Sequence, residues 1–167
     1  MKTREWLMTD ESLLDQDINS FEDLSPQERE NLRLVMTELK GWATQSVDMV
    51  LSVMARDGVY YDITGEPAAG HEAIREFGIG WIDAVPDFVP YIEAFVVQGN
   101  KVVNMGRIRG TIKKSFFGLP ATGKKFDCQY CQVAFIEDGK IKYVRDHWNL
   151  VDMYHQVGWD CSTLNPK

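Results

Sequence analysis

The chain has 167 residues, of which 44% are hydrophobic and 26% are charged, a composition typical of one globular domain with its own core. No apolar run approaches the ~20 residues of a membrane span, and the chain lacks the basic stripe that nucleic-acid binding requires. Most of the net charge of −7 lies in residues 1–30, which hold nine acidic and three basic residues. Because the first residues have no apolar core of a secretion signal, we expect a cytoplasmic protein with an acidic arm (1–24), one domain (25–160) and a tail (161–167).

The first long helix is predicted to begin after Ser25. Ser25 can cap the helix, Pro26 fits its first position and Glu28 completes a capping box. Apolar residues over 32–43 then recur at helical spacing, which predicts one buried helix face.

The other predicted elements follow from apolar periodicity and from glycine and proline turns. In chain order they are a short helix over 47–55 that Asp57-Gly58 ends, a strand over 59–63, a helix over 71–84, strands over 88–97, 101–113, 126–136 and 140–149, and a short helix over 150–157. The last two strands are joined by Asp138-Gly139, a strong hairpin signal. This order predicts an α+β fold in which a curved antiparallel sheet carries helices on one face.

The three cysteines, Cys128, Cys131 and Cys161, do not suggest a disulfide framework, because their number is odd. Cys128 and Cys131 have a spacing found in metal sites. In a strand, however, they point to opposite faces, and no second Cys or His pair completes a zinc site. We therefore expect reduced thiols and no metal.

The strongest functional signal is Asp146. In the predicted last strand the side chains alternate, so that Val144, Asp146 and Trp148 share one face while Arg145 and His147 lie on the other. A carboxylate placed between an aliphatic residue and a tryptophan is rarely buried unless it is paired or functional. Asp146 is therefore a candidate catalytic group.

Three segments of the chain resemble the SnoaL-like polyketide cyclases of the NTF2-like superfamily. They lie between Trp42 and Gly158 and read MARDGVYYDITGEPAAGHEAIREF, VPDFVPYIEAFVVQGNKVV and FFGLPATGKKFDCQYCQVAFIEDGKIKYVRDHWNLVDMYHQVG. The resemblance implies a cone-shaped barrel in which the curved sheet and the N-terminal helices enclose an apolar pocket. It also implies a homodimer packed through the outer face of the sheet.

The resemblance further implies which residues carry the chemistry. In these cyclases an aspartate on the final strand is the general acid and base, and Asp146 aligns with it. A histidine often stands on the adjacent strand, where this chain has Gln132, which can donate a hydrogen bond but cannot carry a proton near neutral pH. We expect Asp146 to abstract a proton, with Gln132 and a tyrosine or histidine stabilising the enolate oxygen and no cofactor required.

The pocket wall is expected to be mainly aromatic, formed by Trp42, Phe77, Trp81 and Trp148. Tyr60 and Tyr61 face opposite ways in their strand, and we expect Tyr61 to line the pocket. His71 can point into it from the start of its helix. The predicted substrate is a hydrophobic, carbonyl-bearing small molecule of polyketide type, and the predicted reaction is an aldol-type cyclisation or a related isomerisation or dehydration.

Three alternatives remain open at this point. Asp146 can form a structural ion pair with Arg107, Arg109 or Arg145. The superfamily also includes epoxide hydrolases, a reaction that would need Asp146 together with Asp48 or Asp62 and Arg107 around one water. Finally, the chain can be a non-catalytic ligand-binding or dimerisation domain, which the missing histidine favours.

Overall fold

A computed structural model describes residues 11–116 and 118–163 of the chain. Within them, four α-helices and a 6-stranded sheet form the body of the molecule. The α-helices are α1 (Pro26–Ala43), α2 (Val47–Val53), α3 (Gly70–Ala84) and α4 (Leu150–Val157), and the strands are β1 (Met54–Tyr61), β2 (Ala68–Ala69), β3 (Val89–Gln98), β4 (Lys101–Thr111), β5 (Lys125–Glu137) and β6 (Lys140–Trp148). Short 3-10 turns cover Leu13–Asp15, Ile18–Ser20 and Cys161–Thr163.

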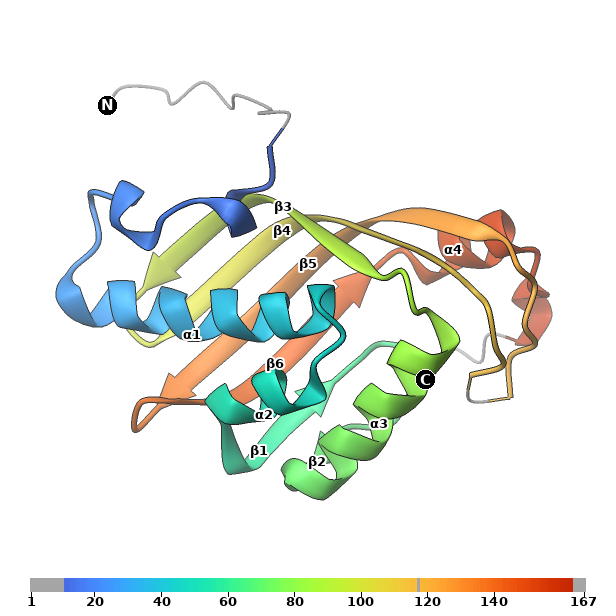
Figure 1. Cartoon of the computed structure of the whole chain (residues 1–167), viewed down its shortest axis with the longest axis horizontal. Coiled ribbons are helices and arrows are strands. Elements are labelled where there is room, and N and C mark those ends of the chain that lie inside the picture. Colours follow the sequence, from blue (N-terminus) through green and yellow to red (C-terminus); the bar gives the residue numbers. More distant parts are fainter. Residues whose placement is uncertain (1–10, 117, 164–167) are drawn as a thin grey trace.

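The sheet has the strand order β2-β1-β6-β5-β4-β3. Its neighbouring strands are antiparallel, except that β1 and β6 run parallel. The sheet curves around α1, α2 and α3, which lie on one of its faces (Figure 1). Because β2 and β3 remain as edges, the sheet is not closed into a complete barrel. The predicted α+β architecture is confirmed.

Helix α1 begins as its sequence predicts. The Ser25 side chain accepts a hydrogen bond from the Glu28 backbone, and the Glu28 side chain reaches back to the Ser25 backbone, so that both orphan donors are satisfied. The inward face of α1 is fully buried, with Leu32, Val35 and Leu39 at most 1% exposed. This apolar face holds the helix over the concave side of the sheet.

The beginning of β1 differs from its prediction. The short helix α2 ends at Val53 and β1 already begins at Met54, so Asp57-Gly58 lies inside the strand. Met54 pairs with Ile141 and Val59 with Tyr143, and the residues of β1 between these pairs therefore bulge away from β6. A Cβ atom at Gly58 would lie 2.9 Å from the Ala55 carbonyl oxygen, which explains why glycine occupies this bulge. The turn signal in the sequence marks the bulge and not the end of a helix.

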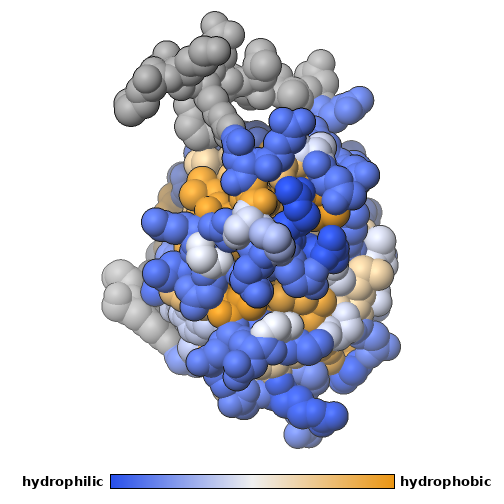
Figure 2. Space-filling model, turned by 90° about the vertical axis from the view of Figure 1, so that its left-hand side faces the viewer, coloured by the Kyte–Doolittle hydropathy of each residue, from blue (hydrophilic) through white to orange (hydrophobic). Residues whose placement is uncertain are grey.

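The described part of the acidic arm packs on the domain. Leu14 is buried, and the Ser12 hydroxyl accepts a 3.0 Å hydrogen bond from the Ile92 backbone on the edge strand β3. Arg29 of α1 donates to the Ile18 carbonyl at 2.9 Å. Figure 2 views the end of the molecule at the left of Figure 1 and shows apolar surface only in gaps between hydrophilic residues. The division into arm, domain and tail stays a prediction, since 1–10 and 164–167 lie outside the described residues.

None of the helices within residues 11–116 and 118–163 is long and apolar enough to cross a membrane.

Candidate active site

A small cavity lies between the concave face of the sheet and helices α1 and α3. Its volume is about 30 Å³, which accommodates one or two water molecules. Most of its wall is aromatic, and two carboxyl groups reach it; the lining residues are Leu39, Trp42, Tyr60, Asp62, Phe77, Trp81, Phe88, Pro90, Ile108, Tyr130, Asp146 and Trp148. No lysine, arginine or histidine is among them. The cavity is thus a narrow, mainly apolar space with acidic groups at its surface.

Asp146 reaches this cavity from β6, on the face that its alternation with Val144 and Trp148 predicted. Its side chain is 95% buried, since the residue is only 5% exposed. The Tyr60 hydroxyl donates to Asp146 Oδ2 at 2.6 Å, and the Tyr130 hydroxyl donates to Oδ1 at 3.2 Å. Two phenols from neighbouring parts of the sheet therefore hold the carboxyl group in one orientation.

The surroundings of Asp146 change its acidity. Burial raises the pKa of Asp146 to about 7, and the negative charge of Asp62 adds to this rise. Hydrogen bonds from Tyr60, Gln132 and Tyr130 act in the opposite direction, because they stabilise the ionised form. Burial, followed by the charge of Asp146, raises the pKa of both tyrosines, so they remain hydrogen-bond donors at neutral pH. A carboxyl group that titrates near neutrality can both take up and return a proton.

Behind Asp146, a second carboxyl group is fully buried on α1. Glu38 is 0% exposed and accepts a hydrogen bond from the Trp42 indole nitrogen. Gln132 Nε2 lies 3.4 and 3.3 Å from the two Glu38 oxygens, and Gln132 Oε1 accepts from Asn104 Nδ2 at 2.8 Å. Burial raises the pKa of Glu38 to about 8, and the charge of Asp146 contributes to this rise. The predicted residue Gln132 is therefore part of a buried polar network and is not among the cavity-lining residues.

The structure brings four of the predicted wall residues together. Trp42, Phe77, Trp81 and Trp148 all line the cavity. The Trp42 ring meets Phe77 edge-on with centroids 6.3 Å apart, and Trp81 meets Trp148 in the same way at 6.1 Å. A Cβ atom at Gly78 would lie 3.2 Å from the Trp42 ring, so the glycine allows α3 to approach that ring closely. Edge-on aromatic pairs of this kind stabilise a wall beyond the area that they bury.

Two predicted wall residues lie elsewhere. Tyr60 lines the cavity, whereas Tyr61 points to the opposite face, where its ring lies 4.9 Å from the Arg145 guanidinium. The prediction for Tyr61 is therefore wrong, because the bulge in β1 decides which tyrosine faces inward. His71, at the start of α3, places Nε2 3.1 Å from the Met54 carbonyl oxygen and is not among the cavity-lining residues.

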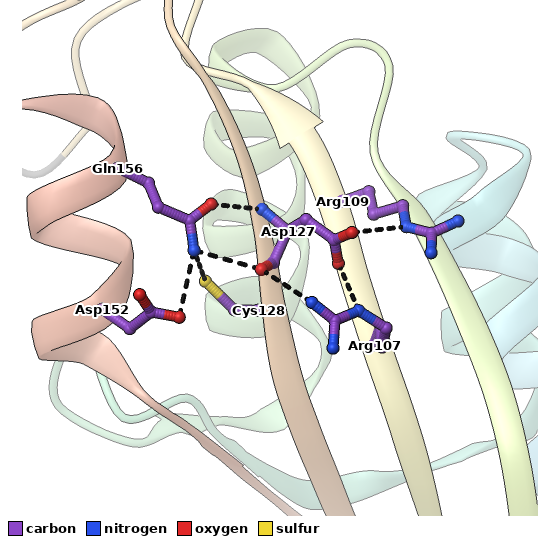
Figure 3. A network of polar contacts seen from close by, with 6 residues as sticks. All are labelled: Arg107, Arg109, Asp127, Cys128, Asp152 and Gln156. Carbon is purple, nitrogen blue, oxygen red and sulfur yellow. Dashed lines mark hydrogen bonds and ion pairs between the residues drawn. The ribbon is translucent and has the colours of Figure 1, made fainter.

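The arginines proposed as ion-pair partners are occupied elsewhere. Arg107 and Arg109 both bind Asp127, at 2.6 and 3.1 Å, next to α4 (Figure 3). Among the described residues, no ion pair includes Asp146. The ion-pair alternative for Asp146 is thus wrong.

The same positions bear on the epoxide-hydrolase alternative. Asp48 binds Arg75 at 2.8 Å at the surface, and Arg107 lies on the outer face, so only Asp62 reaches the same cavity as Asp146. The site lacks the arginine that this reaction would need.

Sequence reasoning missed Glu38, Tyr130 and Asn104. For Glu38 a signal existed, because Val35, Glu38 and Trp42 are spaced by three and four residues and therefore share one helix face. For Tyr130 the signal was its alternation with Gln132 on β5. Within the described residues, no group of three or more His, Cys, Asp or Glu side chains is placed to hold a metal ion.

The comparisons with known proteins agree with this architecture. A solved structure from Jannaschia sp. CCS1, assigned as a SnoaL-like polyketide cyclase, is 20% identical, has a TM-score of 0.75 and covers 81% of this chain and 96% of that one. IdmH from Streptomyces antibioticus, assigned as a polyketide cyclase, is 20% identical with a TM-score of 0.65 and covers 77% and 98%. AclR from Streptomyces galilaeus, assigned as a hydroxylase, is 18% identical with a TM-score of 0.67 and covers 78% and 97%.

At such identities these structures show a shared fold, the NTF2-like cone, and not a shared reaction. No curated protein matches the sequence. The family model described as SnoaL-like polyketide cyclase matches residues 33–157, which include the C-terminal part of α1, the whole sheet and the site around Asp146. The chain therefore belongs to the family of SnoaL-like polyketide cyclases.

Proposed function

We propose that the protein is an enzyme in which Asp146 acts as general base and acid on a hydrophobic, carbonyl-bearing small molecule. The observation that carries the proposal is the state of Asp146. It is a buried carboxyl group at a cavity, with no basic partner in the described part of the chain and with a pKa raised to about 7. A buried aspartate with a purely structural role is usually paired with a cation, whereas this one is held by two phenols. Such an arrangement suits proton transfer near neutral pH.

The proposed reaction is an intramolecular aldol cyclisation. Asp146 takes the proton from a carbon between two carbonyl groups, and the electron pair of the C–H bond forms an enolate. The enolate carbon attacks a second carbonyl carbon of the same molecule, and the resulting alkoxide takes the proton back from Asp146. Isomerisation and dehydration use the same first step.

The tyrosines are the proposed partners of the enolate oxygen. Tyr60 and Tyr130 are protonated donors at the cavity, whereas Gln132 is engaged by Glu38 and Asn104. Their hydroxyl groups can turn from Asp146 to the enolate as negative charge moves from one to the other. The absence of a basic residue from the lining also disfavours a substrate with a carboxylate or phosphate at this point.

The size of the cavity sets a condition for this function. A volume of about 30 Å³ is too small for a polyketide, so the aromatic wall must move when a substrate enters. Phe77 is the candidate for this movement, since it is only partly buried, whereas Trp42 and Trp81 are 4% and 7% exposed. Its ring packs edge-on against Phe116, at 5.9 Å.

A second candidate function, non-catalytic binding of a small ligand, is favoured by the small volume of the cavity. A cavity largely filled by its own aromatic side chains is typical of a site that has lost its reaction. The two functions differ in whether Asp146 exchanges a proton with the bound molecule.

Proton exchange can be tested without knowing the natural substrate. The probe is 3-methyl-2,4-pentanedione, whose acidic proton lies between two carbonyl groups, and its exchange in D₂O is followed by proton NMR. Wild type and Asp146→Asn are compared, each also in a Phe77→Ala background that enlarges the cavity. We expect exchange above buffer in at least one background and its loss with Asp146→Asn. If exchange in both backgrounds is independent of Asp146 while the diketone still binds, the protein is a binding domain.

The homodimer implied by the family resemblance stays a prediction. Val96 and Met105 are exposed on the outer face of the sheet, at 55% and 45%, which supports an interface there. Sedimentation equilibrium of wild type and Met105→Glu tests it.

A further inference from the structure

Glu38 is a titratable group that the proposed reaction does not use. It lies in the C-terminal half of α1, a helix that crosses the concave face of the sheet (Figure 1). It has no exposed surface, and its identified donors are the Trp42 indole and the Gln132 amide. Burying a carboxyl group without an ion-pair partner costs free energy. We therefore ask what role its charge or its proton has.

Gln132 connects Glu38 to Asp146. It stands directly opposite Asp146 in the β5–β6 ladder, and its amide interacts with the carboxyl groups of both residues. An amide can present its nitrogen to an ionised Glu38 or, turned over, its oxygen to a protonated one. With Asn104 turned likewise, the Gln132 nitrogen would then face Asn104 Oδ1, an atom that is otherwise buried without a partner in the described part of the chain.

Within residues 11–116 and 118–163, neither of the two carboxyl groups forms an ion pair. The charge that acts on Glu38 is that of Asp146 on β6, and Glu38 in turn raises the pKa of Tyr60 on β1 and of Tyr130 on β5. No charged side chain from α2, β3 or β4, which also pack against α1, is among the causes of its shift. Asp146 is also acted on by the charge of Asp62. Two buried carboxyl groups joined by one amide repel each other when both are ionised, so near neutral pH we expect Glu38 and Asp146 to hold one proton between them and to titrate as a pair.

We propose that Glu38 is the positioning residue of the site, which keeps the shared proton so that Asp146 is the group that ionises. Asp146, 5% exposed at the cavity, accepts two tyrosine hydroxyls, and these stabilise its ionised form. Glu38, with no exposed surface, accepts from one indole, that of Trp42, and otherwise has only the long 3.3 and 3.4 Å contacts of Gln132. Burial raises the pKa of Glu38 to about 8 and that of Asp146 to about 7, in the same order. The inference rests on the proposed function only for its consequence: a neutral Glu38 places no second negative charge behind the enolate.

Glu38→Gln is the decisive variant, because glutamine has the shape of protonated glutamate and still accepts from the Trp42 indole. In wild type we expect the rate of diketone exchange to rise through pH 7 and to fall about tenfold per pH unit once Glu38 ionises, above about pH 8. Glu38→Gln should keep the exchange rate at neutral pH and lose the alkaline fall. Glu38→Leu, which removes the polar contacts as well, should slow exchange at every pH.

A second measurement does not depend on turnover. The side-chain carboxyl carbons of wild type, labelled with ¹³C, are titrated by NMR and assigned with Glu38→Gln and Asp146→Asn. The expected result is that Asp146 ionises before Glu38 and that each titration changes when the partner is replaced. If Glu38 ionises first, or if the titration of Asp146 is the same in Glu38→Gln, the proposal is overturned even if exchange is catalysed. If Asp146 ionises before Glu38 but no exchange occurs, the proposed function is wrong, and the role of Glu38 in keeping the proton is still supported.

Discussion

Asp127 and Asp146 lie on opposite faces of one sheet and illustrate two ways of holding a carboxylate. Asp127, on the outer face, is 43% exposed and binds the guanidinium groups of Arg107 and Arg109 (Figure 3). Asp146, on the inner face, is 5% exposed and accepts hydrogen bonds from two tyrosines. One carboxylate is balanced by full positive charges, and the other only by dipoles.

The difference between these surroundings decides what each aspartate can do. A guanidinium keeps its proton at all relevant pH values, so the two positive charges beside Asp127 are permanent. The hydrogen bond with Asp127 accordingly raises the pKa of Arg107 further. Phenol donors in a buried place stabilise a carboxylate less than burial destabilises it, and the pKa of Asp146 ends near 7. The inner face therefore holds a carboxyl group that can change its charge near neutral pH.

The sharpest test of this comparison replaces each aspartate by asparagine. Asp146→Asn should lower the rate of diketone exchange by about 10²–10⁴-fold, the usual contribution of a general base. Asp127→Asn, a matched control on the same sheet, should leave the rate unchanged. Equal losses in the two variants would mean that the effect comes from stability and not from chemistry.

The stability of the fold should depend on pH in a way that Asp146 explains. Its folded pKa, about 7, is above that of an exposed aspartate, so its contribution to stability is fully present below about pH 4 and is lost as the pH rises through 7. Asp146→Asn removes this loss. When the pH rises from 4 to 8, the free energy of unfolding of the variant should increase relative to that of wild type by on the order of 4 kcal/mol, at ~1.4 kcal/mol per pH unit. Urea unfolding at several pH values measures the difference, and a constant difference would contradict the assignment.

The two tyrosines should differ in their effect on Asp146. Tyr60→Phe removes the 2.6 Å donor and Tyr130→Phe the 3.2 Å donor, so each should raise the pKa of Asp146, Tyr60→Phe by more. The acidic side of the exchange profile should move to higher pH in the same order. A profile that stays in place in Tyr60→Phe would show that the hydroxyl does not act on the carboxyl group.

The smallest effect is expected on the outer face. Arg107 and Asp127 are both partly exposed, and such ion pairs contribute roughly 0–1 kcal/mol. Asp127→Asn should therefore lower the free energy of unfolding by less than about 1 kcal/mol, and high salt should reduce the difference further. Thermal unfolding with and without 1 M NaCl, an ionic strength at which screening acts over about 3 Å, measures it.

Most of the fold could be predicted because its signals are local. The capping box at Ser25, the Asp138-Gly139 turn and the alternation along β6 each correspond to what the structure shows. The choice between Tyr60 and Tyr61 could not be made, since it depends on a bulge whose position is set by pairing with β6, far away in the sequence.

The site was predictable only in part, for a related reason. Asp146 and the aromatic wall stand out because acids and tryptophans are conspicuous within a strand or helix pattern. The meeting of Glu38 with Gln132 joins α1 to β5 across 94 residues of sequence, and no local pattern contains it. Networks of this kind need the packing of a helix onto a sheet before they become visible.

The hydrogen bond from the Ile92 backbone to the Ser12 hydroxyl affects how readily molecules of this protein associate. β3 is an edge strand, and unpaired backbone groups along such an edge can add a strand from another molecule. The Ser12 hydroxyl accepts the hydrogen bond of the Ile92 amide where β3 bulges against β4, and Leu14, two residues further on, is buried. The described part of the arm thus covers this point of the edge, and we expect a chain shortened to begin after Leu24 to aggregate more readily than the full chain.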